Sequence, residues 1–298
     1  MYGGTCELTD KAWGRIEPLL PPVESGGRRW RDHRQVINAI LWKLRTGAPW
    51  RDLPERYGPW KTAHERLRIW TADGTWERIL DEVIVKDDSI GNVEWTFSVD
   101  SSSVRAHQHS AGARKKGAAP PNGSKTFAVD GEALGRSRGG LTSKIHLAVD
   151  GRGLPMSVIL TPGQAGDNPH LLPLLDQVAV GRAGPGRPRT HPHRVLADKA
   201  YSHPSTRAAM RARGIAFTSP QRSDQISRRK AKGSRGGRPP AFDPQHYAGR
   251  NVVERCFNRL KQFRALATRY AKRVAYYRSE IIIAAIVLWL RADLQDTA

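Results

Sequence analysis

Two apolar runs that each end on an aspartate are the strongest constraint on the fold of this chain. Residues 93–100 alternate apolar and polar side chains up to Asp100, which is typical of a β-strand with one buried face. Residues 194–198 form a shorter apolar run that ends on Asp198. In open α/β sheets, sites form beyond the carboxyl ends of strands. We therefore expect Asp100 and Asp198 to end neighbouring strands and to converge.

The rest of this region alternates strands and helices. Lys144 to Val149, an Asp150-Gly turn and Leu154 to Leu160 predict a hairpin. Further predicted elements are a helix opened by Asn168-Pro169, a helix capped by Ser202 and ended by Gly214, a strand at 215–219, and a helix begun by Asp243-Pro244. The order predicts an α/β domain.

The last of these helices carries a polar face. Tyr247, Arg250, Glu254 and Lys261 lie at offsets 0, 3, 7 and 14. At about 100° per residue they fall within about 60° of one another on one continuous helix. The apolar residues of the same stretch (Val253, Cys256, Phe257, Leu260) centre roughly 100° further round. The helix can therefore pack on a core and hold a carboxylate between cations at its edge.

A carboxylate between cations binds a metal ion poorly, so other acids should join Glu254. Asp100 and Asp198 are the candidates, although a turn acid could occupy either position. Three carboxylates from separate elements suit a hard cation. Two Mg²⁺ ions, with Mn²⁺ as a substitute, could then support phosphoryl transfer. Asp150 and Asp167 are interpreted as turn and helix-start acids.

The charge of the chain points to a polyanionic partner. It has 298 residues and 49 Lys and Arg against 28 Asp and Glu, a formal charge of +21. Because the basic residues cluster, we favour nucleic acid over a protein kept soluble by charge or drawn to anionic membranes. Residues 221–242 are expected to be a basic, phosphate-contacting loop. The candidate DNA contacts are Tyr247, Arg250, Lys261, Arg105, Arg228, Arg229, Lys230, Lys232, Arg235, Arg238, Lys61, Arg66 and Arg68.

The first ninety residues predict a small helical domain. Apolar spacing indicates helices at 8–20, at 32–45 behind an Asp32 cap, and at 60–71. A turn-rich break followed by a basic helix is the layout of a helix-turn-helix DNA reader. An ordinary helical bundle with a basic surface is the alternative. The expected domains are therefore 1–90, helical and DNA-binding, and 91–298, catalytic, with a C-terminal helix at about 274–292.

The chain is expected to act in the cytoplasm, in association with the nucleoid. Its two cysteines, Cys6 and Cys256, are too few for a disulfide framework, and its start lacks the regions of a secretory signal. The longest apolar run, Ile281 to Leu290, is well short of the roughly 20 residues that span a bilayer. That run could cover the core of its own subunit or serve a dimer interface, and we favour the first.

Several motifs resemble those of bacterial insertion-sequence transposases of the DDE class, specifically the insertion-sequence-five family. They are residues 53–60 (LPERYGPW), 99–108 (VDSSSVRAHQ), 135–146 (GRSRGGLTSKIH), 197–201 (ADKAY) and 250–261 (RNVVERCFNRLK). The resemblance implies an RNase H-like mixed sheet with flanking helices and a metal-binding triad of Asp100, Asp198 and Glu254. It also implies that Tyr247, Arg250 and Lys261 complete a Tyr-Arg-Glu-Lys signature whose cations grip phosphates.

The function implied by this resemblance is transposition. Such an enzyme binds double-stranded DNA at the terminal repeats of its element, cleaves the ends and joins them to target DNA, as a homodimer or larger assembly. One alternative is a catalytically silent DNA-binding regulator. Another is a tyrosine recombinase, because His191-Pro-His-Arg194 fits a His-x-x-Arg pattern, but it leaves the acids unexplained.

Overall fold

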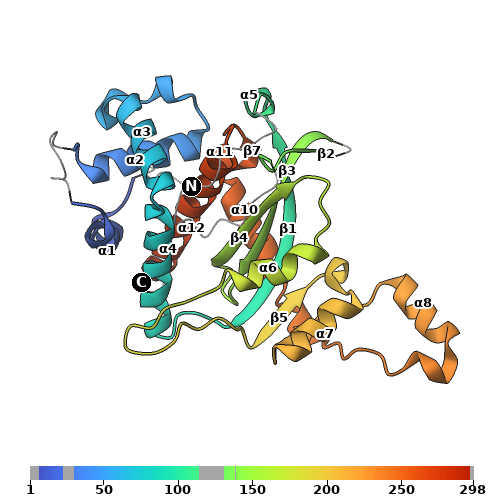
Figure 1. Cartoon of the computed structure of the whole chain (residues 1–298). Coiled ribbons are helices and arrows are strands. Elements are labelled where there is room, and N and C mark those ends of the chain that lie inside the picture. Colours follow the sequence, from blue (N-terminus) through green and yellow to red (C-terminus); the bar gives the residue numbers. More distant parts are fainter. Residues whose placement is uncertain (1–6, 23–29, 114–130, 138, 296–298) are drawn as a thin grey trace.

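The computed structural model describes residues 7–22, 30–113, 131–137 and 139–295. Within these ranges a mixed β-sheet is flanked by helices and preceded by a helical region (Figure 1). The fold class expected from the sequence is therefore confirmed.

The helical region begins with α1 (Asp10–Ile16), extended by a 3₁₀ turn, Glu17–Leu19. It continues with α2 (His33–Thr46), α3 (Trp60–Ala72) and α4 (Thr75–Ser89). Asp32 caps α2 as expected, accepting from the Gln35 N–H at 2.7 Å. Gly47, at a φ of 70°, ends it. The three helices expected here are confirmed, with α4 as a further one.

The sheet is built around β1 (Thr96–Ala106). Its other strands are β2 (Gly135–Ser137), β3 (Gly140–Val149), β4 (Pro155–Pro162), β5 (Arg194–Ala197), β6 (Ala216–Thr218) and β7 (Thr268–Arg269). The main order is β2-β3-β1-β5-β6, with β4 also paired to β3 and β7 to β1. Strands β1, β3 and β4 are antiparallel, whereas β5 and β6 run parallel to β1. This is an RNase H-like arrangement.

Strand β1 differs from its expected end at Asp100. It continues six residues further because β3 keeps pairing with it as far as Arg105, opposite Thr142. Asp100 therefore lies inside the strand. The expected strand end at Asp198 is confirmed, since β5 stops at Ala197 and Asp198 follows directly.

Helices cover both faces of the sheet. Helix α6 (Leu171–Asp176) lies on one face, and α10 (Asn251–Lys261) with α12 (Val274–Gln295) on the other (Figure 1). Shorter helices are α5 (Gln108–Ala111), α7 (Pro204–Ala212), α8 (Ser223–Ala231), α9 (Pro244–Ala248) and α11 (Arg264–Ala267), and 3₁₀ turns occur at Trp50–Asp52, Glu55–Tyr57, Asn168–His170, Lys199–Tyr201 and Gly233–Gly236. His203, not Ser202, caps α7, because the Ser202 hydroxyl already donates to the Lys199 carbonyl at 2.7 Å.

The single helix expected from Asp243 to Lys261 is two helices, α9 and α10. The helix is interrupted at Gly249 and Arg250, and Arg250 occupies the N-cap position of α10. Glycine is a poor helix former, which favours a break at this point. Tyr247 consequently belongs to a different helix from Glu254 and Lys261.

Helix α12 joins the helical region to the sheet. Its apolar run from Ile281 to Leu290 is buried within this chain, as favoured from the sequence. The buried Lys43 of α2 binds Glu280 of α12 at 2.6 Å, and the Trp289 indole donates to the Pro155 carbonyl of β4 at 2.8 Å. None of the described helices is long and apolar enough to cross a bilayer.

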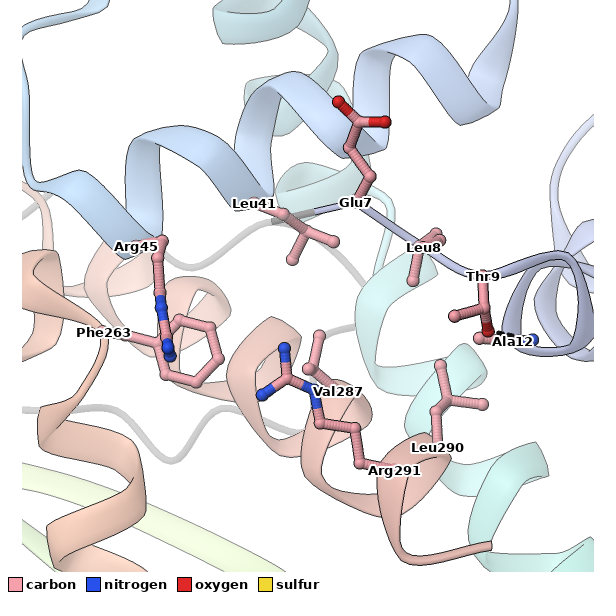
Figure 2. Close-up of a pocket in the computed structure, with 10 residues that line it drawn as sticks. All are labelled: Glu7, Leu8, Thr9, Ala12, Leu41, Arg45, Phe263, Val287, Leu290 and Arg291. Atoms are coloured by element: carbon pink, nitrogen blue, oxygen red, sulfur yellow. Dashed lines mark hydrogen bonds between the residues drawn. The ribbon is translucent and has the colours of Figure 1, made fainter. Parts of the chain in front are cut away.

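A cavity of about 160 Å³ lies where the N-terminal segment, α2 and α12 meet (Figure 2). Leu41, Phe263 and Val287 give it apolar walls, and the Arg45 guanidinium lies 5.7 Å from the centre of the Phe263 ring. Asp100, Asp198 and Glu254 are not among its lining residues.

Candidate active site

The register of two parallel strands brings Asp100 and Asp198 together. The last pair between β1 and β5 is Val99 with Ala197, so each acid is the next residue on its strand. Neighbouring strands lie about 4.8 Å apart, and residues at matched positions of a ladder share a face. The two carboxylates therefore start side by side on the face that α10 covers.

The edge of β1 is open at this point. Strand β5 pairs with β1 only as far as Val99, and β7 begins to pair only at Arg105. Among the described residues, 100–104 thus have a strand neighbour only on the β3 side. The side chain of Asp100 is 24% exposed beside this gap.

Arg250 connects the third acid to the first. Its guanidinium donates to Asp100 Oδ2 at 3.0 Å and also to a carboxylate oxygen of Glu254, one turn along α10. Val253, Cys256 and Phe257 are buried beneath the helix and fix its orientation against the sheet. Arg250 therefore holds both carboxylates at the open edge of β1.

Burial shapes the electrostatics of these groups. It raises the pKa of the Asp100 carboxyl, and the charge of Asp198 adds to the rise, whereas the Ser101 N–H and Arg250 oppose it. Burial alone would lower the pKa of Arg250, but Asp100 and Glu254 more than offset this and raise it. Arg250 therefore stays charged and neutralises part of the acid cluster.

The acids do not form a metal cage in this arrangement. No group of three or more His, Cys, Asp or Glu side chains in the described ranges is placed to hold a metal ion. In the triad, the Arg250 guanidinium lies between Asp100 and Glu254.

Tyr247 and Lys261 are less closely associated with the acids. The Arg250 guanidinium lies 5.9 Å from the centre of the Tyr247 ring, which also contacts Phe242 at 5.2 Å between ring centres. Lys261 is exposed at the end of α10, about two turns or 10 Å beyond Glu254 on the same side of the helix. It can reach a long substrate rather than the acids themselves.

A second polar cluster lies on the opposite face of the sheet, and the sequence reasoning missed it. The Ser101 hydroxyl donates to Asp167 at 2.7 Å, and Lys144 donates to the same carboxylate oxygen at 2.9 Å. Asp167 was expected to cap a helix start. It occupies that position, but its side chain caps nothing there and turns to Ser101 and Lys144 instead.

Tyr201 and His146 border the second cluster. Burial raises the pKa of Tyr201, and the charges of Asp167, Asp100 and Asp198 raise it further. Burial lowers the pKa of His146 to about 3, so that this side chain is neutral. A signal for these residues was present, because Ser101, Lys144, His146 and Tyr201 all stand in the transposase-like motifs; Asp167 does not.

Helix α3 carries only part of its expected DNA-binding set. Arg66 is 5 % exposed, its guanidinium stacks 3.6 Å from the centre of the Trp30 ring, and it lies 2.9 Å from the His33 ring nitrogen. Arg66 is therefore a buried packing residue and not the exposed DNA contact expected from the sequence. Lys61 and Arg68 are exposed, with Arg68 paired to Glu65.

The basic segment 221–242 is not simply a loop. Residues 223–231 form α8, in which the Gln225 side chain accepts from the Arg222 N–H at 3.3 Å and Arg228 pairs with Asp224 one turn earlier. Helix α8 buries no residue and projects from the body of the protein (Figure 1). Among the DNA contacts expected in this segment, Arg229 is half-buried. The others are exposed, namely Arg228, Lys230, Lys232, Arg235 and Arg238.

The remaining candidates lie elsewhere. Arg105 is exposed near the end of β1 and donates to the Gly139 carbonyl at 2.7 Å. Arg194, from the His-x-x-Arg pattern, donates to the Thr218 hydroxyl at 3.0 Å, and His191 contacts the Thr190 hydroxyl at 2.7 Å. This pattern is thus engaged in local contacts. Asp150 is a turn acid, as interpreted, and accepts from the Leu154 N–H at 2.7 Å.

Two known families match separate stretches of this chain. Residues 8–80 match the family described as putative transposases of the IS4/5 family. Residues 91–290 match the family described as the transposase DDE domain.

Individual relatives point the same way. A putative transposase of insertion sequence element IS6501 from Brucella ovis is 32% identical over 151 residues, which are 51% of this chain and 100% of that protein. A putative transposase of element IS402 from Burkholderia cepacia is 31% identical over 161 residues, 50% of this chain and 67% of that protein. The uncharacterized protein y4sN from Sinorhizobium fredii is 40% identical over 109 residues, 36% of this chain and 83% of that protein. Because the transposase DDE domain spans more than half of the chain, this protein belongs to the family of insertion-sequence DDE transposases.

Proposed function

We propose that this protein binds the terminal repeats of its insertion sequence, cleaves DNA at the ends and joins the freed 3′-hydroxyl to target DNA. The observation that carries the proposal is the β1–β5 register, which sets Asp100 beside Asp198 at the open edge of β1, with Glu254 linked to Asp100 through Arg250. The exposed cations of the segment 222–238 support double-stranded DNA as the partner. Pairing two ends calls for at least a dimer on DNA.

The donor chemistry of the triad fits Mg²⁺ or Mn²⁺, since all three side chains are carboxylates. Asp100, Asp198 and Glu254 would hold the ions, which supply Lewis acidity to the oxygens of a phosphodiester. Arg250 balances two of the three acids in the DNA-free protein. A scissile phosphate offers that guanidinium another anion, and Lys261 can contact the same strand further along.

Replacing a single acid tests the proposal. We expect Asp100→Asn, Asp198→Asn and Glu254→Gln each to abolish cleavage and strand transfer, while DNA affinity stays within about threefold, because such residues act as a unit in the chemical step. The measurement is a single-turnover assay on duplex that contains an element end, with Mg²⁺ and with EDTA. Asp176→Asn, an exposed acid paired to Arg213, is the matched control.

Three outcomes would contradict the proposal. Wild-type rates in any triad variant would remove that acid from the site. Tight DNA binding without metal-stimulated cleavage would indicate a silent regulator. Cleavage that resists EDTA and leaves a phosphotyrosyl adduct would indicate a tyrosine recombinase.

A further inference from the structure

Ser101 links the two faces of the sheet. Its backbone N–H donates to Asp100 Oδ1 at 2.8 Å, and its hydroxyl donates to Asp167 Oδ1 at 2.7 Å. Successive residues of a strand point to opposite faces. Asp100 therefore faces α10, while the Ser101 side chain reaches a carboxylate on the α6 side. One residue connects a candidate catalytic acid to a cluster behind it.

Asp167 is itself firmly held. Lys144 donates to its Oδ1 at 2.9 Å and to the Ala165 carbonyl at 2.6 Å, which fixes the ammonium group between two parts of the same loop. The side chain of Lys144 is 14% exposed and that of Asp167 25%. The positive charge of Lys144 balances that of the Asp167 carboxylate. Asp167 therefore adds little electrostatic repulsion to the carboxylates of Asp100 and Asp198.

The hydrogen bond between Ser101 and Asp167 lies beside a gap in the strand pairing of β1. Pairing between β1 and β5 ends at Val99, and pairing between β1 and β7 begins only at Arg105. In the part of the chain that the structure describes, the backbone at 100 and 101 pairs with a strand, β3, on one side only. The Ser101–Asp167 hydrogen bond therefore restrains the strand where the ladder on its other side is missing.

We propose that Asp167, held by Lys144, is a positioning residue that acts through Ser101 to orient Asp100. The inference rests on the proposed function, in which Asp100 helps to hold the metal ions. Asp167 is not a further ligand, because Ser101 and Lys144 direct its carboxylate to the other face. Partners that orient a metal ligand typically contribute 10- to 100-fold to metal affinity or activity, and we expect about this effect here.

The test compares variants that break the link with variants that keep it. Asp167→Ala and Ser101→Ala remove the hydrogen bond, whereas Asp167→Asn keeps an acceptor and Ser101→Thr keeps a hydroxyl. Ser103→Ala, an exposed serine on the same strand, and Asp176→Asn are matched controls. The measurements are Mn²⁺ affinity, by calorimetry, of the protein bound to an element-end duplex with a non-hydrolysable linkage, the single-turnover cleavage rate on normal duplex, DNA affinity and the midpoint of thermal unfolding.

We expect Asp167→Ala and Ser101→Ala each to lower Mn²⁺ affinity and cleavage rate about 10- to 100-fold with DNA affinity unchanged. The conservative variants should remain within about threefold of the wild type. Because both residues serve one contact, the double variant should equal the single ones. If Asp167→Ala unfolds, the Ser101 pair of variants decides alone.

Two results would overturn the inference. One is Mn²⁺ affinity and cleavage at wild-type levels in Ser101→Ala. The other is a double variant in which the losses multiply, since independent roles would then be indicated. Asp100→Asn distinguishes failure of the positioning role from failure of the proposed function. If Asp100→Asn is inactive while Ser101→Ala has normal activity, only the positioning role of Asp167 fails. If Asp100→Asn is active, the proposed function fails first.

Discussion

The helical region and the segment 222–238 use the same cationic residue types in opposite ways. In the helical region Lys43 and Arg66 are 6 % and 5 % exposed, and each is bound to groups within the chain. In the segment 222–238 α8 buries nothing, and the side chain of Arg228 is 80% exposed. A net charge of +21 is therefore not spread evenly over the surface. Lys43 and Arg66 hold helices together, whereas the cations of α8 are exposed at the surface or only partly buried.

The largest expected effect tests the structural role of the buried cations. Lys43→Met should lower the free energy of unfolding by about 3–5 kcal/mol, because it leaves the buried Glu280 carboxylate without its partner. Chemical denaturation measures this. Lys230→Met, which removes an exposed cation from α8, is the control and should change stability by less than about 0.5 kcal/mol. Equal losses in both variants would erase the distinction between the two regions.

The next effect concerns DNA rather than stability. Substituting Arg228, Lys230, Lys232 and Arg235 together by Gln should reduce the slope of log affinity against log salt by up to about 3 to 4, since each phosphate contact contributes about 0.9. Thermal unfolding should be unchanged. Fluorescence anisotropy across a salt series measures the slope, with Lys86→Gln, at an exposed position of α4, as control. An unaltered slope would mean that these side chains do not meet phosphate.

The last effect concerns His146 and is the smallest near neutral pH, because burial keeps this side chain uncharged there. The folded protein keeps His146 neutral with a pKa of about 3, whereas the unfolded chain protonates it near pH 6.5. Its contribution to stability is therefore lost as the pH falls from about 6.5 toward 3, by at most about 1.4 kcal/mol per pH unit. His146→Gln should show a shallower loss of stability over this range.

The wild type and His146→Gln must be compared directly, because a second buried group, Asp150, changes stability in the opposite direction as the pH falls. Burial raises the pKa of Asp150 to about 6, so its folded form takes up protons more readily and stability rises on acidification between about pH 6 and 4. Denaturation curves at several pH values, measured for both proteins, isolate the histidine. Parallel curves would show that His146 does not titrate differently in the two states.

Periodicity and turn chemistry predicted most of the fold. The cap at Asp32, the hairpin around Asp150 and the strand that ends before Asp198 depend on local residues, and the structure confirms them. Strand β1 was expected to end early because Ser101 to Ser103 carry no strand signal of their own. Pairing with β3, some forty residues away, extends it. Non-local hydrogen bonds of this kind leave no trace in a short window.

The candidate site was predictable in part for the same reason. Asp100, Asp198 and Glu254 stand in recognisable motifs; Arg250 links Asp100 to Glu254, and the β1–β5 ladder sets Asp198 next to Asp100. Asp167 looked like a helix start because its true partners, Ser101 and Lys144, are remote in sequence. Arg66 was misjudged although it stands beside the buried Ala63, Leu67 and Trp70 stripe, because long cationic side chains are usually assumed to reach water.

The pairing of Val99 with Ala197 also says where this chain can change length. A single residue inserted within β5 ahead of Asp198 would turn its carboxylate to the other side of the sheet, as a one-residue slip does for any strand. Extra residues in the turns that connect the strands leave that alternation untouched. Lineages of this protein should therefore gain and lose residues in their connections, while the spacing from Arg194 to Asp198 stays constant.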